Sequence, residues 1–255
     1  MANRPAYAIV GGGYWAGRMR SILAETHRVT CIDHARRQPE ETSRDYETRM
    51  SQTLEDTGAQ IVWICVLPGP HIPAMVQAAL NAGLHAIVEK PWQNSRDETE
   101  RLRELAGRKK LVLGVHYEYC LLEEVQAWRR DYNLGAGLDF GGCFNMSRGN
   151  QQVMNALDNL GSHLLAIRNY AVPCARVSQI RCEYETADER KVWIERDGGL
   201  VASIDFLENH EPIIQRFIEA FERAILGGPF PFDIDFALQV AGTVEGLKAG
   251  QKAWG

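Results

Sequence analysis

The chain has 255 residues, of which 45% are hydrophobic and 24% are charged, and its formal net charge is −5. This length suits one large domain or two smaller ones, and the composition is ordinary for a globular protein. The negative charge and the lack of a basic stripe argue against nucleic acid as the main partner. The longest apolar run, residues 61–67, is too short to span a membrane, and the first residues lack the apolar core of a signal peptide. We therefore expect a cytoplasmic protein that acts on a small molecule.

Six cysteines are scattered along the sequence without any C-x-x-C pair, and no group of His and Cys has the spacing of a zinc site. A compact chain of this length needs neither disulfides nor a metal to be stable. The sequence thus predicts reduced, mostly buried thiols and no metal site.

The first expected element is an apolar strand, residues 6–10, that leads directly into three glycines. Gly11, Gly13 and Ala16 match the G-x-G-x-x-G/A pattern of a strand, turn and helix that hold a dinucleotide pyrophosphate. The first glycine permits the tight turn, the second lets the backbone approach the phosphates, and the small alanine lets the helix pack closely on the strand. The phosphate charge would then meet the free N–H groups of the helix that Tyr14 and Trp15 begin. Because glycine turns are common, the pattern alone is a weak signal.

A second strand, residues 28–33, ends in Asp33, which lies 22 positions after Gly11. A dinucleotide-binding fold places the carboxylate that binds the adenosine ribose at this point. Such a carboxylate repels a 2′-phosphate, so it favours NAD over NADP. Arg36 and Arg37 follow closely and leave NADP open, since they could hold that phosphate or could simply be a solvated pair.

Residues 34–58 are polar and cannot be assigned, whereas residues 61–67 form the strongest predicted strand. A continuous apolar run of this kind is typical of a parallel strand with both faces covered. It ends at Leu67 and Pro68, in the loop where open α/β sheets bind their ligands. A helix with Pro73 in its first turn and Gly83 just after its end, a strand at 85–89, a helix at 95–108 and a strand at 111–115 complete the first region. We therefore predict a doubly wound parallel sheet, a Rossmann domain, over residues 1–116.

Residues 117–255 are predicted to form a smaller α+β domain. Helices are expected at 121–132, 151–170, 212–226 and 236–251, and strands at 138–146, 177–186, 190–195 and 200–207. Residues 197–199, Asp-Gly-Gly, would form the turn between the last two strands. Strands in succession indicate a mostly antiparallel sheet with helices on one face, and the last helix could pack back on the first domain.

Lys90 is the first candidate for chemistry. It follows the strand 85–89, at the same sheet edge as the glycine turn, where it could hydrogen-bond a substrate oxygen beside a nicotinamide. Taken alone, Glu89-Lys90-Pro91 fits an ordinary surface loop better.

His163 is the second candidate. It lies at the border of the apolar stripe of helix 151–170, about 80° from its centre, and such a histidine is more often structural than functional. Asn159 lies one turn before it on nearly the same line, whereas Asp158 points about 140° away from it. Gly161 in mid-helix suggests that another backbone or a ligand passes close by.

Taken as an ordered set, these motifs resemble the glucose–fructose oxidoreductase/inositol dehydrogenase (Gfo/Idh/MocA) family. The likeness rests on the glycine turn, on Val66-Leu67-Pro68 with His71 after it, on Glu89-Lys90-Pro91, on Gly161-Ser162-His163, and on Asp235, Ala237 and Leu238 in the last helix. It implies a Rossmann domain and an α/β substrate domain whose sheet commonly mediates oligomerisation, and therefore a homo-oligomer. It also implies reversible hydride transfer between NAD(P) and a secondary alcohol, typically of a sugar or polyol.

The resemblance also implies roles for individual residues. Lys90 would bind and polarise the reacting oxygen, next to a Lys90–Pro91 bond that could be cis, and His163 would be the general acid or base. The dinucleotide site would comprise Gly11, Gly13, Tyr14, Trp15, Ala16, Asp33, Arg37, Leu67, Pro68, His71, Glu89 and Lys90. The substrate site would comprise Tyr117, Glu118, Asn159 and His163, with Asn159 also counted as catalytic.

Three positions depart from the family, and the second domain is shorter than is typical of it. Ala166 stands where an acid usually follows the histidine by three residues. Asn159 stands where an aspartate usually precedes the histidine by four residues, and as a neutral amide it can orient a substrate but cannot take a proton. Glu118 stands where relatives often have an arginine. If Glu118 faces the substrate it favours a cationic or amine-bearing group, and otherwise it is a solvated residue at the start of a helix.

Three functions are therefore open. The first is an NAD-dependent dehydrogenase or reductase that uses Lys90 and His163. The second is a dinucleotide-binding regulator or subunit that retains the pocket without the reaction. The third is a reductase that acts on an imine or an amino sugar, for which Glu118 is the motive.

Overall fold

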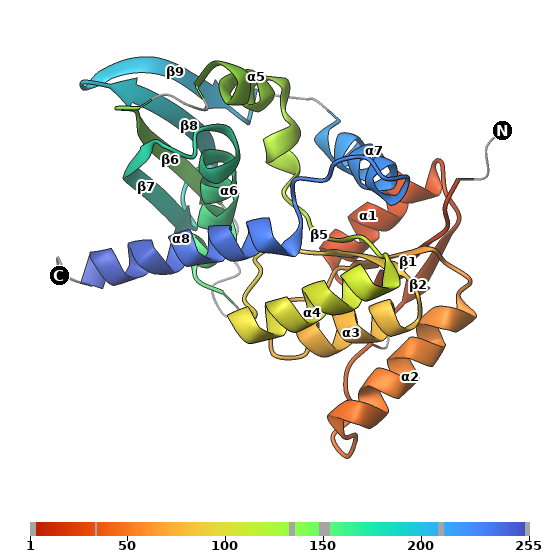
Figure 1. Ribbon diagram of the computed structural model, residues 1–255. Coiled ribbons are helices and arrows are strands. Elements are labelled where there is room, and N and C mark those ends of the chain that lie inside the picture. The colour runs from red at the N-terminus through yellow and green to blue at the C-terminus, as the bar shows by residue number, and fades with distance from the viewer. Residues whose placement is uncertain (1–3, 34, 133–135, 148–153, 209–211, 253–255) are drawn as a thin grey trace. The chain divides into compact units, whose positions relative to one another are not determined.

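The computed structural model describes residues 4–33, 35–132, 136–147, 154–208 and 212–252 (Figure 1). The chain divides into two compact units, residues 1–116 with 218–238, and residues 117–217 with 239–255. The sequence prediction divided the chain once, after residue 116. The structure adds the return of residues 218–238 to the first unit.

The first unit is built on a five-stranded parallel sheet in the order β2-β1-β3-β4-β5. Its strands are β1 (Tyr7–Val10), β2 (Val29–Ile32), β3 (Ile61–Ile64), β4 (His85–Val88) and β5 (Leu113–Val115). Every residue of β1 and β3 is buried, as expected for central strands covered on both faces. The strand order reverses at β1, so the crevice beside it is where a doubly wound sheet binds its ligand. The predicted Rossmann architecture is confirmed.

The helices of this sheet are α1 (Tyr14–Ala24), α2 (Ser43–Asp56), α3 (Ile72–Asn81) and α4 (Arg96–Lys109). Helices α2, α3 and α4 lie next to one another, with α3 in the middle (Figure 1). The sequence analysis left α2 unassigned because its surface is polar. The structure shows why it forms: Thr42 caps its first turn by accepting a bond from Asp45 N–H, and Tyr46, Met50 and Leu54 make one buried stripe.

Residues 218–238 complete the first unit along its edge strand. They comprise the end of α7 (Ile213–Ile225) and the start of α8 (Ile234–Lys252). The backbone N–H of Val115 donates to the carbonyl of Phe232 (2.8 Å), and Gly114 forms an antiparallel bridge with Asp233. A side chain on Gly114 would collide with the ring of Phe230. This segment therefore covers an edge that would otherwise expose unpaired backbone groups.

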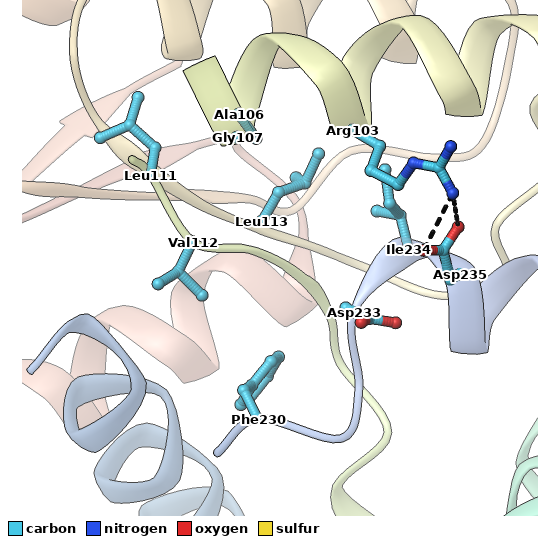
Figure 2. A pocket seen from close by; sticks show the side chains of 10 residues that line it. All are labelled: Arg103, Ala106, Gly107, Leu111, Val112, Leu113, Phe230, Asp233, Ile234 and Asp235. Carbon is cyan, nitrogen blue, oxygen red and sulfur yellow. Dashed lines mark hydrogen bonds and ion pairs between the residues drawn. The ribbon is translucent and has the colours of Figure 1, made fainter. Parts of the chain in front are cut away.

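A hollow of about 210 Å³ lies between α4, the residues that lead into β5, and the segment 230–235 (Figure 2). Its walls are mostly apolar, and Arg103 donates to both carboxylate oxygens of Asp235 beside it, at 3.2 and 3.3 Å. Because it adjoins the amino end of β5, it does not belong to the carboxyl edge where the glycine turn lies.

The second unit is built on a four-stranded sheet in the order β7-β6-β8-β9. Its strands are β6 (Asp139–Met146), β7 (Arg176–Tyr184), β8 (Glu189–Arg196) and β9 (Gly199–Asp205). The pairs β6–β8 and β8–β9 are antiparallel, as predicted, whereas β6–β7 is parallel, so the sheet is mixed. The turn before β9 is the expected one, with Asp197 and Gly198 at φ +52° and +77°.

The helical elements that lie wholly within this unit are a 3₁₀ turn η1 (Glu118–Leu121), α5 (Glu123–Tyr132), a π-helical turn η2 (Leu157–Gly161) and α6 (Ser162–Ala171). The unit also contains the start of α7 and the larger part of α8. Helix α6 packs on β6, where Leu164 lies against Gly142. The sequence predicted one regular helix over 151–170. Its first residues, 151–153, lie outside the described residues, and its middle is the π-turn rather than α-helix.

Candidate functional site

The glycine turn begins at a position that only glycine can occupy. Gly11 has φ +130°, and a Cβ there would lie 2.5 Å from the carbonyl oxygen of Cys65, which directly follows β3. Its N–H donates to the carbonyl of Ile32 at the end of β2 (3.0 Å). The turn is therefore fixed between the ends of the two strands that flank β1.

The first turn of α1 fits an anion. Gly13 is its N-cap, no side chain caps it, and its first turn carries no acidic residue. A Cβ on Gly13 would have no neighbour within 4 Å among the described atoms. Ala16 is buried against the sheet, whereas Tyr14 is 67% exposed and Trp15 is partly buried. The first N–H groups of α1 thus meet an open surface, which is what a pyrophosphate requires.

Asp33 and Arg37 lie where the sequence predicted an adenosine ribose. Asp33 is exposed just after β2, and its Oδ1 lies 3.7 Å from the position of a Cβ on Gly12. The guanidinium of Arg37 donates to the carbonyl of Glu41 (2.7 Å) and to the hydroxyl of Ser43 (3.4 Å). The Asp33 carboxylate therefore faces the glycine turn. The Arg37 guanidinium is hydrogen-bonded within its own loop, to Glu41 and Ser43.

The loop after β3 carries the next predicted residues. Leu67 is 50% exposed, Pro68 is half-buried, and His71 is the N-cap of α3 with its ring against Gly69. All three follow β3 at the carboxyl edge of the sheet, as the dinucleotide prediction requires. His71 occupies the N-cap position of α3, but its side chain makes no hydrogen bond to the first turn of the helix.

Lys90 follows β4 at this edge, beside a polar cluster that the sequence analysis missed. The Lys90–Pro91 bond is cis, as the resemblance implied. The Oε1 atom of Glu89 accepts a bond from the indole N–H of Trp63 (2.9 Å) and lies 3.1 Å from Nδ1 of His116. The rings of Trp63 and His116 meet edge to face at 4.9 Å. The signal for His116 was its position directly after β5, the same place that Asp33 has after β2.

His163 belongs to the second unit, at the start of α6. It is 6% exposed and lies between two aromatic rings: Tyr119, edge to face at 4.9 Å, and Phe144, tilted at 5.4 Å. The sequence analysis placed it at the border of an apolar stripe and missed both rings. Their signal is weak, since η1 and β6 are far from α6 in sequence.

The π-turn changes the geometry before His163. Asn159 donates from its side chain to the hydroxyl of Tyr184 (2.8 Å), a partner that the sequence did not predict. Asp158 lies 2.5 Å from Nζ of Lys248 in an ion pair. The angles of about 80° and 140° assumed α-helical spacing, and they are wrong here because a π-turn holds more residues.

Gly161, Tyr117 and Glu118 also differ from expectation. The space beside Gly161 is filled by side chains, Leu157 and Cys182, and not by another backbone or a ligand. Tyr117 and Glu118 are 1% and 5% exposed, so the description of Glu118 as a solvated residue is wrong.

Two general features were searched over the described ranges. Within them, no group of three or more His, Cys, Asp or Glu side chains could hold a metal ion. None of their helices is long and apolar enough to cross a membrane.

The chain was compared with known proteins. Residues 6–117 match the model of an oxidoreductase family with an NAD-binding Rossmann fold, Gfo/Idh/MocA. An uncharacterized oxidoreductase of Schizosaccharomyces pombe is 35% identical over 69 residues, which are 27% of this chain and only 18% of that protein.

Two solved structures share the fold along nearly the whole chain. GenD2 from gentamicin A biosynthesis, in complex with NAD, is 17% identical with a TM-score of 0.72, over 96% of this chain and 93% of GenD2. UDP-N-acetylglucosamine 3-dehydrogenase GnnA from Acidithiobacillus ferrooxidans is 16% identical with a TM-score of 0.75, over 94% of this chain and 95% of GnnA. At this level of identity the likeness establishes the fold.

Proposed function

We propose that the chain, whose residues 6–117 match the Gfo/Idh/MocA family of NAD-binding oxidoreductases, transfers a hydride between a nicotinamide dinucleotide and a secondary alcohol or ketone of a sugar, polyol or related metabolite. The observation that carries the proposal is the uncapped first turn of α1 beside Gly11 and Gly13. Two structures of similar fold support the proposal: GenD2, in complex with NAD, supports the cofactor, and GnnA, by name a sugar-nucleotide dehydrogenase, supports the substrate class.

The cofactor would be held by the carboxyl edge of the first sheet. The amides of the α1 turn would bind the pyrophosphate, and Asp33 would accept bonds from the adenosine ribose. We propose NAD rather than NADP, because Arg37 is engaged by Glu41 and Ser43 and the Asp33 carboxylate would repel a 2′-phosphate. When bound, the nicotinamide supplies or accepts the hydride.

Lys90 and His163 would handle the reacting oxygen and its proton. Oxidation of a secondary alcohol removes a hydride from carbon and a proton from the hydroxyl. We assign the proton to the imidazole of His163, and we assign to the ammonium of Lys90 a hydrogen bond that stabilises the oxygen as its negative charge grows. In the reverse direction His163 returns the proton to the carbonyl oxygen.

A second candidate, a dinucleotide-binding protein without hydride transfer, is favoured by one observation. The residue four positions before His163 is the neutral amide of Asn159, which donates to Tyr184, and the neighbouring carboxylate of Asp158 is paired with Lys248. A neutral amide cannot stabilise a protonated imidazole by opposite charge, which favours a protein that binds the dinucleotide without carrying out the reaction.

Steady-state assays of NADH formation and consumption, with a panel of sugars, polyols and their ketones, separate the two. We expect turnover in the native chain and a loss of about a hundredfold or more in kcat for Lys90→Ala and for His163→Ala. Lys109→Ala is the matched control, since its ammonium only donates to the carbonyl of Asn81 on the surface. Turnover that survives in both variants contradicts the assigned roles. NADH binding without turnover on any substrate favours the second candidate.

A variant at Glu118 tests whether the substrate is an imine or an amino sugar. The buried position of Glu118 supports an effect on the substrate. If the substrate carries an amine, Glu118→Gln should lower the preference for amine-bearing over neutral substrates, measured as the ratio of kcat/KM values. An unchanged ratio removes this alternative.

We also propose a homo-oligomer that forms through the face of the second sheet opposite α6. That face carries cross-strand ion pairs, Arg176–Asp139 at 2.7 Å and Lys191–Asp205 at 3.1 Å, and the ring of Trp193 lies across Gly141. Tryptophan and arginine are both enriched in protein interfaces, which supports this face as the contact surface. Light scattering should give a mass above that of one chain, and Trp193→Glu should lower it. A monomeric native protein would refute this proposal.

A further inference from the structure

Arg190 lies on the covered face of the second sheet. It pairs in register with Phe144, so the two side chains share a face. Gly142, two residues before Phe144, lies against Leu164 of α6, which identifies this face as the one under the helix. The guanidinium carbon of Arg190 lies 5.0 Å from the centre of the Phe144 ring, and Nη1 donates to the hydroxyl of Tyr119 (3.3 Å).

Arg190 and His163 contact the same two rings. Tyr119 and Phe144 are the aromatic neighbours of the His163 imidazole, at 4.9 and 5.4 Å. Phe206 extends this cluster, with its ring 5.1 Å from that of Tyr119. A positive charge thus adjoins the aromatic surroundings of the histidine that we assign to proton transfer.

No carboxylate neutralises this charge among the residues that the structure describes. Arg190 is half-buried, and its Nε–H is fully buried without a hydrogen-bond acceptor there. Three other arginines of the unit pair with carboxylates, Arg176 with Asp139, Arg181 with Glu189 and Arg216 with Glu123, and the half-buried Arg168 donates to the carbonyl of Ala175. Buried charges in proteins are normally paired, because desolvation without a partner is costly. The Arg190 guanidinium is held by the hydroxyl of Tyr119 and the ring of Phe144, and its buried Nε–H can still donate a hydrogen bond. Such a group can bind a planar or tetrahedral anion.

We propose that Arg190 binds an anionic group of the substrate, a carboxylate or a phosphate, and so sets the substrate class of the site that contains His163. This inference rests on the proposed function for its meaning in catalysis. Anion binding itself does not rest on the proposed function, since the residues that it needs all lie in the second unit.

Calorimetric titration tests the assignment with three probes: glucuronate for the carboxylate, inorganic phosphate for the phosphate, and glucose as the neutral counterpart. We expect the native chain to bind one of the two anions and to prefer it over glucose. Arg190→Met, which keeps the aliphatic stem, should weaken that binding by about 10- to 100-fold, as the loss of hydrogen bonds to a charged group implies. Arg190→Lys should retain part of it, because an ammonium keeps the charge without the fork.

Arg181→Met is the matched control. Arg181 pairs in register with Cys143, the neighbour of Phe144, so it lies on the opposite face of the same sheet, where it bonds to the Cys143 sulfur and to Glu189. Its loss removes the same charge from the chain and should leave anion binding unchanged. If Arg190→Met fails to fold, Arg190→Lys and Tyr119→Phe carry the test, and Tyr119→Phe should also weaken binding because it frees Nη1 from its fixed position.

Binding of neither anion by the native chain, or equal binding by the native chain and the Arg190 variants, would overturn the inference. Arg190-dependent anion binding in a chain that transfers no hydride would refute the proposed function and leave the anion site standing. Hydride transfer with equal kcat/KM for acidic and neutral substrates in the native chain would refute the anion site and leave the proposed function standing.

Discussion

Replacing Gly13 by alanine separates cofactor binding from the stability of the fold. Gly13 has φ −84° and ψ 178°, an extended conformation that alanine adopts, and its Cβ would have no described neighbour within 4 Å. Loss of glycine at an N-cap costs about 0.5–1.5 kcal/mol. The smaller entropy of the unfolded chain offsets about 0.4–1 kcal/mol of this. We therefore expect the free energy of unfolding to change by about 1 kcal/mol or less, which is a shift in Tm of at most roughly 2–4 °C.

The same methyl group would stand where the pyrophosphate approaches α1. It would lengthen at least one charge-assisted hydrogen bond, each worth about 1.5–3 kcal/mol. The dissociation constant of NAD⁺ should therefore rise by about 10- to 100-fold, measured by calorimetry on samples whose melting curves are recorded in parallel.

Gly17→Ala is the matched control for this prediction. Gly17 lies one turn later in α1, is exposed, and also has room for a Cβ. We expect unchanged affinity and a gain of about 0.5–1 kcal/mol in stability, since alanine is the better helix former. Gly11→Ala, in contrast, should destabilise the fold itself because of its positive φ and the Cys65 carbonyl. Unchanged NAD⁺ affinity in a folded Gly13→Ala variant would refute the placement of the phosphates at α1.

Three further predictions concern the first unit. Nδ1 of His85 accepts from the N–H of Val112 (2.9 Å), and burial lowers its pKa below the ordinary 6.5. The folded state then binds fewer protons than the unfolded state, so stability falls as pH drops through 6.5. His85→Gln should flatten that slope in denaturant melts between about pH 5 and 7, and an equal slope contradicts this reasoning. Gly114→Ala should destabilise by about 1–3 kcal/mol through collision with Phe230; Phe230→Leu in the same chain should restore part of the loss, and no recovery would point to another cause. Thr42→Ala should cost about 1 kcal/mol in the same melts, and Thr42→Ser, which keeps the capping oxygen, should cost less; equal losses would rule out the cap.

The first sheet was predictable from the sequence because its signals are local. The strand residues are continuous apolar runs, and the glycine turn needs residues only within a few positions of Gly11. Helix α2 was missed although its signals are also local: Thr42 and Asp45 form a cap, and Tyr46, Met50 and Leu54 recur every four residues. The stripe was overlooked because most of the other residues of α2 are polar.

The missed features depend on residues far apart in the chain. The parallel pairing of β7 with β6 follows from the helical crossover through α6, which brings the chain back to the same end of the sheet, and no short pattern encodes it. His116 meets Glu89 only when the sheet brings β4 and β5 together, and Arg190 meets Tyr119 across 71 positions of sequence. The π-turn before His163 was hidden because helical periodicity assumes a constant number of residues per turn. These contacts belong to the tertiary structure.

The return of residues 218–238 means that the dinucleotide-binding half is not a contiguous stretch of the gene. A product truncated before this segment would keep every residue of the proposed dinucleotide site, yet it would lack the backbone partners of Gly114 and Val115. Its last strand would then be ready to pair with other copies, and such a fragment should aggregate. A minimal version of this half needs the two pieces rejoined, for example by a linker from residue 117 to residue 218. A frameshift shortly before codon 218 would damage this half without changing any residue that we propose to hold the cofactor.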